Sequence, residues 1–124
     1  MRALLFASLL ALPLPVLAQD SPAPQTVEVR LSSFAFEPRE LRLAAGRPVV
    51  LRLTNTGGGG HNFSAPQFFA AATGVSGPVE DGEVEVAGHQ TVEVRLTPAR
   101  GRYRLRCTHT LHSTFGMRGT ITVE

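Results

Sequence analysis

Apolar and polar residues alternate with a period of two along most of the chain after residue 25. Over residues 26–31 this alternation places Val27, Val29 and Leu31 on one face, with charged residues between them. Such a period is typical of β-strands that are buried on one face only. The same pattern predicts further strands over residues 40–43, 49–54, 83–86, 91–96, 103–107 and 119–123.

Glycine and proline residues separate these segments and predict turns between short strands. Seven to eight strands, with no regular alternation of strands and helices, predict an all-β fold: an antiparallel β-sandwich or barrel. One short helical segment is predicted over residues 66–73, because a proline begins it and three consecutive alanines follow. Phe68 and Phe69 are expected to pack this helix onto the sandwich.

The first residues have the features of a secretory signal peptide. Arg2 precedes an apolar run over residues 3–12, and Val16, Leu17 and Ala18 form a small-residue cleavage site. Pro13 interrupts the apolar run, which is too short to span a membrane. We therefore expect a signal peptide over residues 1–18, a flexible leader over 19–25 and one domain over 26–124, exported to the periplasm or beyond and without stable membrane insertion.

The charged residues do not form a nucleic-acid-binding surface. The chain has 12 basic residues, all arginine, against 10 acidic ones, and the arginines are spread along the predicted strands. Four of them, Arg100, Arg102, Arg104 and Arg106, alternate along one strand face. Solvation of a strand face is the simplest interpretation, and a docking role stays open. The acidic residues near position 83 lack the spacing of an EF-hand calcium site.

Candidate metal ligands gather in the last quarter of the chain. The single cysteine, Cys107, is followed by His109, His112 and Met117, while His61 ends a glycine run far upstream. An unpaired cysteine in an exported protein is an intermolecular linker, a buried residue, or a reactive or metal-bound thiol. Two histidines, one cysteine and a weak axial methionine are the ligands of a blue-copper electron-transfer site.

Two loop histidines compete for one ligand position. His109 lies two residues from Cys107 and faces the same way if the chain stays extended. His112 is separated by four residues from both Cys107 and Met117, so a loop that folds back over an ion suits it better. We predict the ligands His61, Cys107, His112 and Met117. Whether His109 replaces or supplements His112 stays open.

With these residues in place, the chain resembles the cupredoxins, the small blue copper proteins. The spacing of Cys107, His112 and Met117 is most similar to that of rusticyanin, auracyanin and azurin. The resemblance implies a Greek-key sandwich with one type 1 copper ion. It also implies that Asn62, directly after His61, ties the two ligand loops together by hydrogen bonds.

Three functions are compatible with these features. The first is a monomeric electron carrier that docks transiently on redox partner proteins through an apolar rim of Leu111, Phe115 and Gly116 around His112. The second is a copper chaperone, scavenger or resistance factor, which His109 and a loose glycine loop would favour. The third is an interaction domain without metal. An enzyme is not expected, because the copper oxidases of this family need further copper centres or domains.

Overall fold

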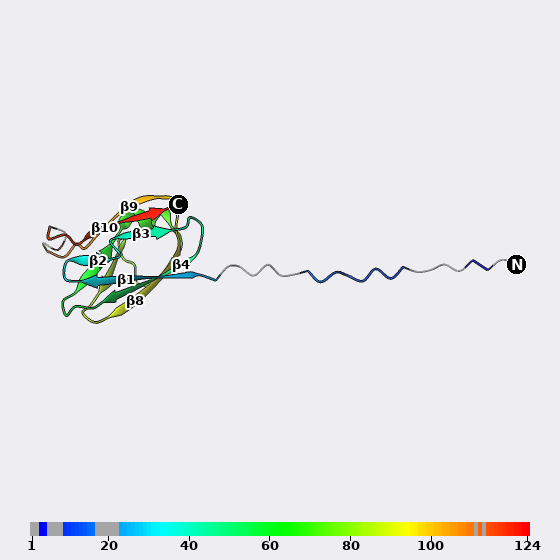
Figure 1. Ribbon diagram of the computed structural model, residues 1–124, viewed down its shortest axis with the longest axis horizontal. Helices are drawn as coiled ribbons and strands as arrows, with labels where there is room; N and C mark the ends of the chain where they lie inside the picture. The colour runs from blue at the N-terminus through cyan, green and yellow to red at the C-terminus, as the bar shows by residue number, and fades with distance from the viewer. Residues whose placement is uncertain (1–2, 5–8, 17–22, 111, 113) are drawn as a thin grey trace.

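Two five-stranded sheets form the domain in the computed structural model, which describes residues 3–4, 9–16, 23–110, 112 and 114–124. The first sheet has the order β2-β1-β4-β8-β6 and the second β3-β10-β9-β5-β7 (Figure 1). The strands of the first sheet are β2 (Ala35–Glu37), β1 (Gln25–Ser32), β4 (Val49–Asn55), β8 (Thr91–Thr97) and β6 (Thr73–Ser76). Those of the second are β3 (Glu40–Leu43), β10 (Arg118–Val123), β9 (Gly101–Arg106), β5 (His61–Ser64) and β7 (Glu83–Val86).

The predicted strands are confirmed, each within two residues of its expected ends. Three further strands among the described residues, β2, β5 and β6, were not expected. The helix is also confirmed as α1 (Pro66–Ala71), which is shorter than predicted at its C-terminal end. Cys107, predicted as the last residue of a strand, lies immediately after β9, and Met117 lies immediately before β10.

The two sheets contain both parallel and antiparallel strand pairs, whereas we predicted an antiparallel sandwich from the alternation pattern. β1 pairs in parallel with β4, and β3 pairs in parallel with β10. The chain leaves the first sheet after β2, adds β3 to the second sheet and returns to place β4 beside β1. Such a crossover makes neighbouring strands parallel. Alternation within one strand specifies its buried face and carries no information on the direction of its neighbour.

The apolar faces of both sheets meet in one core. β8 illustrates the pattern, with Val92, Val94 and Leu96 buried and the residues between them exposed. As predicted, α1 buries Phe68 and Phe69 against this core. The Phe68 ring meets the Tyr103 ring edge-on at 5.6 Å, which fastens the helix to β9. The core therefore holds β9 and β5, the two strands that lead into the candidate ligands.

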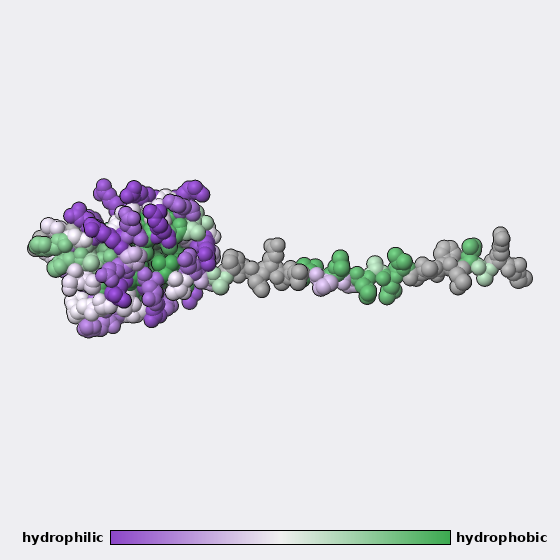
Figure 2. Space-filling model, in the orientation of Figure 1, coloured by the Kyte–Doolittle hydropathy of each residue, from purple (hydrophilic) through white to green (hydrophobic). Residues whose placement is uncertain are grey.

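Residues 3–4 and 9–16 adopt neither helix nor strand, and their apolar side chains are exposed (Figure 2). The predicted cleavage site at residue 18 and most of the predicted leader lie outside the described residues. Within the described part of the chain, no helix has the length and apolar character needed to cross a membrane.

Candidate metal centre

His61 is placed by a loop that is tightly hydrogen-bonded despite its glycines. Asn55, at the end of β4, is buried, and its Nδ2 donates to the carbonyl oxygens of Gly59 at 2.8 Å and Val86 at 3.0 Å. Its Oδ1 accepts from the backbone N–H of Gly57 at 3.0 Å. One amide side chain thus spans the glycine run and fixes the position of His61, the first residue of β5.

A second loop closes over the same glycines. The backbone N–H of His89 donates to the carbonyl oxygen of Gly57 at 3.1 Å. Gly88 approaches the backbone of Gly58 so closely that a Cβ on Gly88 would overlap the Gly58 carbonyl. Only glycine permits this approach. The loop before His61 is therefore constrained from two sides, contrary to the loose loop expected from its sequence.

The loop after β9 is closed by three backbone hydrogen bonds. Cys107 N–H donates to the carbonyl of Met117 at 3.1 Å, and Met117 N–H donates to that of His112 at 3.0 Å. His112 N–H donates to the carbonyl of His109 at 3.1 Å. The loop therefore folds back on itself and brings residues 107, 112 and 117 to one end of the sandwich. Residues 111 and 113 of this loop lie outside the described part of the chain. Residue 111 is Leu111, one of the predicted rim residues.

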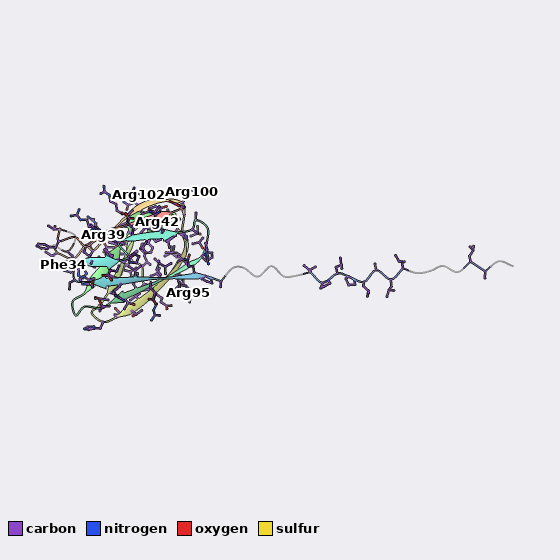
Figure 3. The ribbon with its side chains drawn as sticks, in the orientation of Figure 1. Phe34, Arg39, Arg42, Arg95, Arg100 and Arg102 are labelled. Atoms are coloured by element: carbon purple, nitrogen blue, oxygen red, sulfur yellow. The ribbon has the colours of Figure 1, made fainter. Side chains whose placement is uncertain are left out.

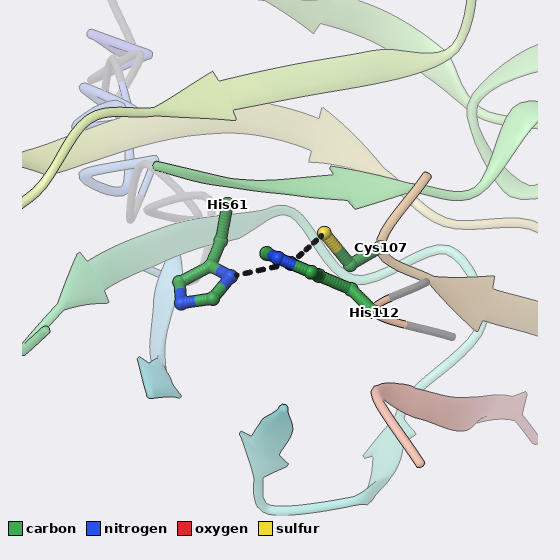
Figure 4. Close-up of side chains that lie close together, drawn as sticks. All are labelled: His61, Cys107 and His112. Atoms are coloured by element: carbon green, nitrogen blue, oxygen red, sulfur yellow. Dashed lines mark hydrogen bonds between the residues drawn. The ribbon is translucent and has the colours of Figure 1, made fainter. Parts of the chain in front are cut away.

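Three of the four predicted ligands converge. His112 Nδ1 lies 3.1 Å from His61 Nδ1 and 3.3 Å from Cys107 Sγ (Figure 4). One ligand atom from each of the three side chains lies within 4.8 Å of the others. Met117, the fourth, is fully buried at the end of the same loop and is bonded through its backbone to both Cys107 and His112.

The site is largely shielded from solvent. The Cys107 thiol is fully buried and forms no disulfide, and His61 is only 6% exposed, whereas His112 is half-buried. Burial lowers the pKa of His61, because it disfavours the charged imidazolium, and the nearby His112 and His109 lower it further. His61 is therefore held in the neutral form that a metal ion requires.

Asn62 links the two loops, as the resemblance implied. Its Oδ1 accepts from the backbone N–H of Thr108 at 2.8 Å, and its Nδ2 donates to the Thr108 hydroxyl at 2.6 Å. The same Nδ2 lies 3.3 Å from a Glu83 oxygen and 3.1 Å from a Glu85 oxygen. Because Asn62 follows His61 and Thr108 follows Cys107, these bonds hold two predicted ligands in register.

His109 takes a different position from His112. Its Nε2 lies 2.9 Å from the Glu85 carboxylate, and its ring centre is 5.5 Å from that of His112. It does not belong to the group of converging ligand atoms. No feature of the sequence signals its pairing with Glu85.

Phe34 is a site residue that the sequence did not reveal. Its ring meets the His112 imidazole edge-on at 5.0 Å and lies 5.5 Å from the Phe115 ring. Phe34 has a φ of 58°, which is uncommon for a bulky residue. It is 41% exposed and Phe115 is 63% exposed, so an exposed aromatic surface lies beside His112.

The donor set identifies the kind of metal that fits. The converging atoms are two imidazole nitrogens and a thiol sulfur, with a buried thioether on the same loop and no carboxylate. Hard cations such as calcium and magnesium prefer oxygen ligands, so they do not fit. Thiolate and thioether ligands with imidazoles suit copper, and two histidines with one cysteine and a methionine are the ligands of a type 1 copper site.

Comparisons with known proteins agree with this geometry. A family model described as a cupredoxin-like domain matches residues 3–123. The structure is similar to auracyanin B, with 29% identity over 86% of this chain and 93% of that one and a TM-score of 0.64. It is also similar to auracyanin A, a "blue" copper protein from Chloroflexus aurantiacus, with 24% identity over 82% of this chain and 100% of that one and a TM-score of 0.60.

A larger protein shares the fold. A multicopper oxidase from Aquifex aeolicus matches 93% of this chain with 17% identity and a TM-score of 0.62, but the match spans only 32% of the oxidase. A search of curated protein sequences finds no match.

Proposed function

The chain belongs to the cupredoxin family, and from this premise we propose that it is an exported blue-copper protein that carries single electrons between partner proteins. The observation that carries the proposal is the convergence of His61, Cys107 and His112 at a largely buried site. The exposed apolar residues before residue 17 support removal of a signal peptide, and so a periplasmic or other exported location.

We assign His61, Cys107, His112 and Met117 as the copper ligands. When bound, copper supplies one-electron chemistry between its Cu(II) and Cu(I) states. Cys107 gives a thiolate in a site without competing thiols, since the chain has one cysteine. His61 and His112 give neutral imidazoles, and Met117 gives a weak thioether contact that tunes the reduction potential together with hydrogen bonds to the thiolate.

The surroundings of the ligands support a carrier. Asn55 fixes the loop before His61, and Asn62 fixes His61 relative to Cys107. Ligands that are held in place independently of the metal rearrange little when its charge changes, so the barrier to electron transfer stays small. The buried thiol and His61 also keep water away from the reacting atoms.

His112 supplies the route to a partner. It is half-buried, and Phe34, which contacts it, forms an exposed apolar rim beside it together with Phe115. Transient electron-transfer complexes use small interfaces, so a rim of this kind is sufficient for docking. The described residues hold a single cluster of candidate ligands, which suits a protein that carries one electron at a time.

Copper titration of the mature chain tests the proposal. We expect one equivalent of Cu(II) to give an intense blue thiolate absorption that disappears and returns with one-electron reduction and oxidation. Cys107→Ser should abolish the absorption. His89→Asn is the matched control, because His89 lies outside the cluster and asparagine tolerates its positive φ. A colourless Cu(II) complex, or full colour in Cys107→Ser, would refute the proposal.

A copper chaperone or scavenger is the second candidate. His109 lies beside His112 and is paired with Glu85, so it offers a further imidazole near the site during metal transfer. Tight Cu(I) binding without a blue Cu(II) form would identify this function. The constrained loop before His61 argues for the carrier, since release of the metal is easier from a loose site.

A further inference from the structure

The outer face of β9 carries a row of arginines beside the metal centre. Leu105 points into the core, while Arg102, Arg104 and Arg106 are exposed on the opposite face. No ion pair in the described part of the chain involves these three side chains. Their positive charge is therefore not neutralised by the protein's own carboxylates.

Two of these arginines line a groove. Arg104 and Arg106 border a hollow of about 620 Å³, together with Arg118 from β10, Gln67 from α1 and Thr114 from the ligand loop. Arginine presents a planar fork of N–H donors that matches the two oxygens of a carboxylate. The groove thus combines guanidinium groups with amide and hydroxyl groups, which also bind carboxylates.

The register of the sheet places like charges face to face. Arg106 on β9 is directly opposite Arg118 on β10. Like charges directly opposite each other destabilise a sheet. The register therefore concentrates guanidinium groups at this end of the groove.

The groove adjoins the ligands along the chain. Arg106 directly precedes Cys107, and Arg118 directly follows Met117. On the other side of β5, the β7 carboxylates Glu83 and Glu85 are near Asn62. This face of the second sheet therefore has a basic side and an acidic side, and both adjoin the metal centre.

We propose that this groove binds the acidic face of a redox partner protein, with the partner's carboxylates on Arg104 and Arg106. The identity of the partner as a redox protein rests on the proposed electron-carrier function. Arg102 continues the row beyond the groove, so the basic surface is longer than a single small anion requires. A charged strip of this kind accelerates association and sets the orientation of the complex, and the β7 carboxylates repel the partner from the opposite side.

A nuclear magnetic resonance titration of the mature, isotope-labelled chain with a hexaglutamate peptide tests the proposal. We expect saturable shifts at the amides of β9, β10 and α1 that weaken as salt is added. The double variant Arg104→Gln/Arg106→Gln should bind the peptide about tenfold more weakly. Arg95→Gln is the matched control, because Arg95 is an exposed arginine on β8 of the other sheet, on the opposite side of the domain from Arg102 (Figure 3).

Three outcomes would overturn the proposal: no shifts with the peptide, equal binding by the double variant, or an equal loss in Arg95→Gln. Binding of inorganic phosphate as tightly as the peptide would also overturn it and would identify a small-anion site. The spectra of the free variants show whether they remain folded. Peptide binding involves no electron transfer, so failure of the carrier function alone would leave these shifts unchanged and appear only in the copper titration.

Discussion

Asn62 and Thr108 are joined by two hydrogen bonds that connect the two halves of the metal centre. The backbone N–H of Thr108 donates to Asn62 Oδ1 at 2.8 Å, and Asn62 Nδ2 donates to the Thr108 hydroxyl at 2.6 Å. The two residues are 46 positions apart, and each directly follows a proposed ligand. The relative position of His61 and Cys107 therefore depends on one buried amide.

Asn62→Ala should loosen the site as well as destabilise the fold. Loss of these bonds should lower the free energy of unfolding of the copper-free protein by about 1–2 kcal/mol, measured by urea denaturation. The blue absorption should also shift or broaden, since the ligands would be less well fixed. Ser64→Ala is the control, because Ser64 is buried on the same strand and donates to Glu83 without reaching the ligand loop. An identical spectrum and equal destabilisation in both variants would contradict the role given to Asn62.

His112 and His109 should differ sharply in their effect on copper. His112→Ala should remove the blue absorption, because its Nδ1 lies within hydrogen-bonding distance of His61 and Cys107. His109→Ala should keep it, because His109 Nε2 pairs with Glu85. The measurement is the visible spectrum and copper content of each purified variant after titration. The opposite pattern would make His109 the ligand.

The sequence was informative about the site because alternation fixes which residues face inward. Strands over 103–107 and 119–123 were predicted from it and correspond to β9 and β10, which bring Cys107 and Met117 to one end of the sandwich. The choice of His112 depended on loop spacing alone. What the spacing could not show is the backbone bonding of His112 to His109 and Met117, which is decided by the folded loop.

Two of the three strands that sequence reasoning missed lack an alternating pattern, and the third, β2, has only three residues. β5 is buried at all four positions and β6 is exposed at all four, so neither has an alternating pattern. β5 lacks it because Asn62 and Ser64, which face away from the core, are covered by the carboxylates of β7 and by Thr108. Phe34 was missed because its contact with His112 depends on a positive φ that no sequence pattern signals.

Gly88 should be sensitive to substitution, although it lies outside the proposed ligand set. A methyl group on Gly88 would overlap the carbonyl of Gly58, so Gly88→Ala should cost about 1–3 kcal/mol in unfolding free energy and displace the loop before His61. Gly59→Ala is the control, because a methyl group there meets no atom within 4 Å. Thermal and urea unfolding measure both variants. Equal stability of the two would show that the loop adapts freely.

The copper-free protein should lose stability as the pH is lowered, because of His61. Its pKa is lowered in the folded state by burial and by the neighbouring histidines, whereas in the unfolded chain it has the ordinary value of 6.5. Between these two values the unfolded state binds more protons than the folded state, so the free energy of unfolding rises with pH. Acidification below pH 6.5 should therefore destabilise the protein until the folded pKa is passed.

Replacement of the His61 imidazole isolates its contribution to the pH dependence of the free energy of unfolding. His61→Gln has no group that titrates at this position, so its unfolding free energy should depend less steeply on pH between pH 7.5 and pH 5 than that of the unaltered chain. Urea denaturation at a series of pH values gives both slopes, and His89→Asn is the control for loss of a histidine outside the cluster. If His61→Gln keeps the original slope while His89→Asn flattens it, the titrating group is not His61. Since copper binds only the neutral imidazole, the same proton should also compete with the metal, and copper affinity should weaken over the same pH range.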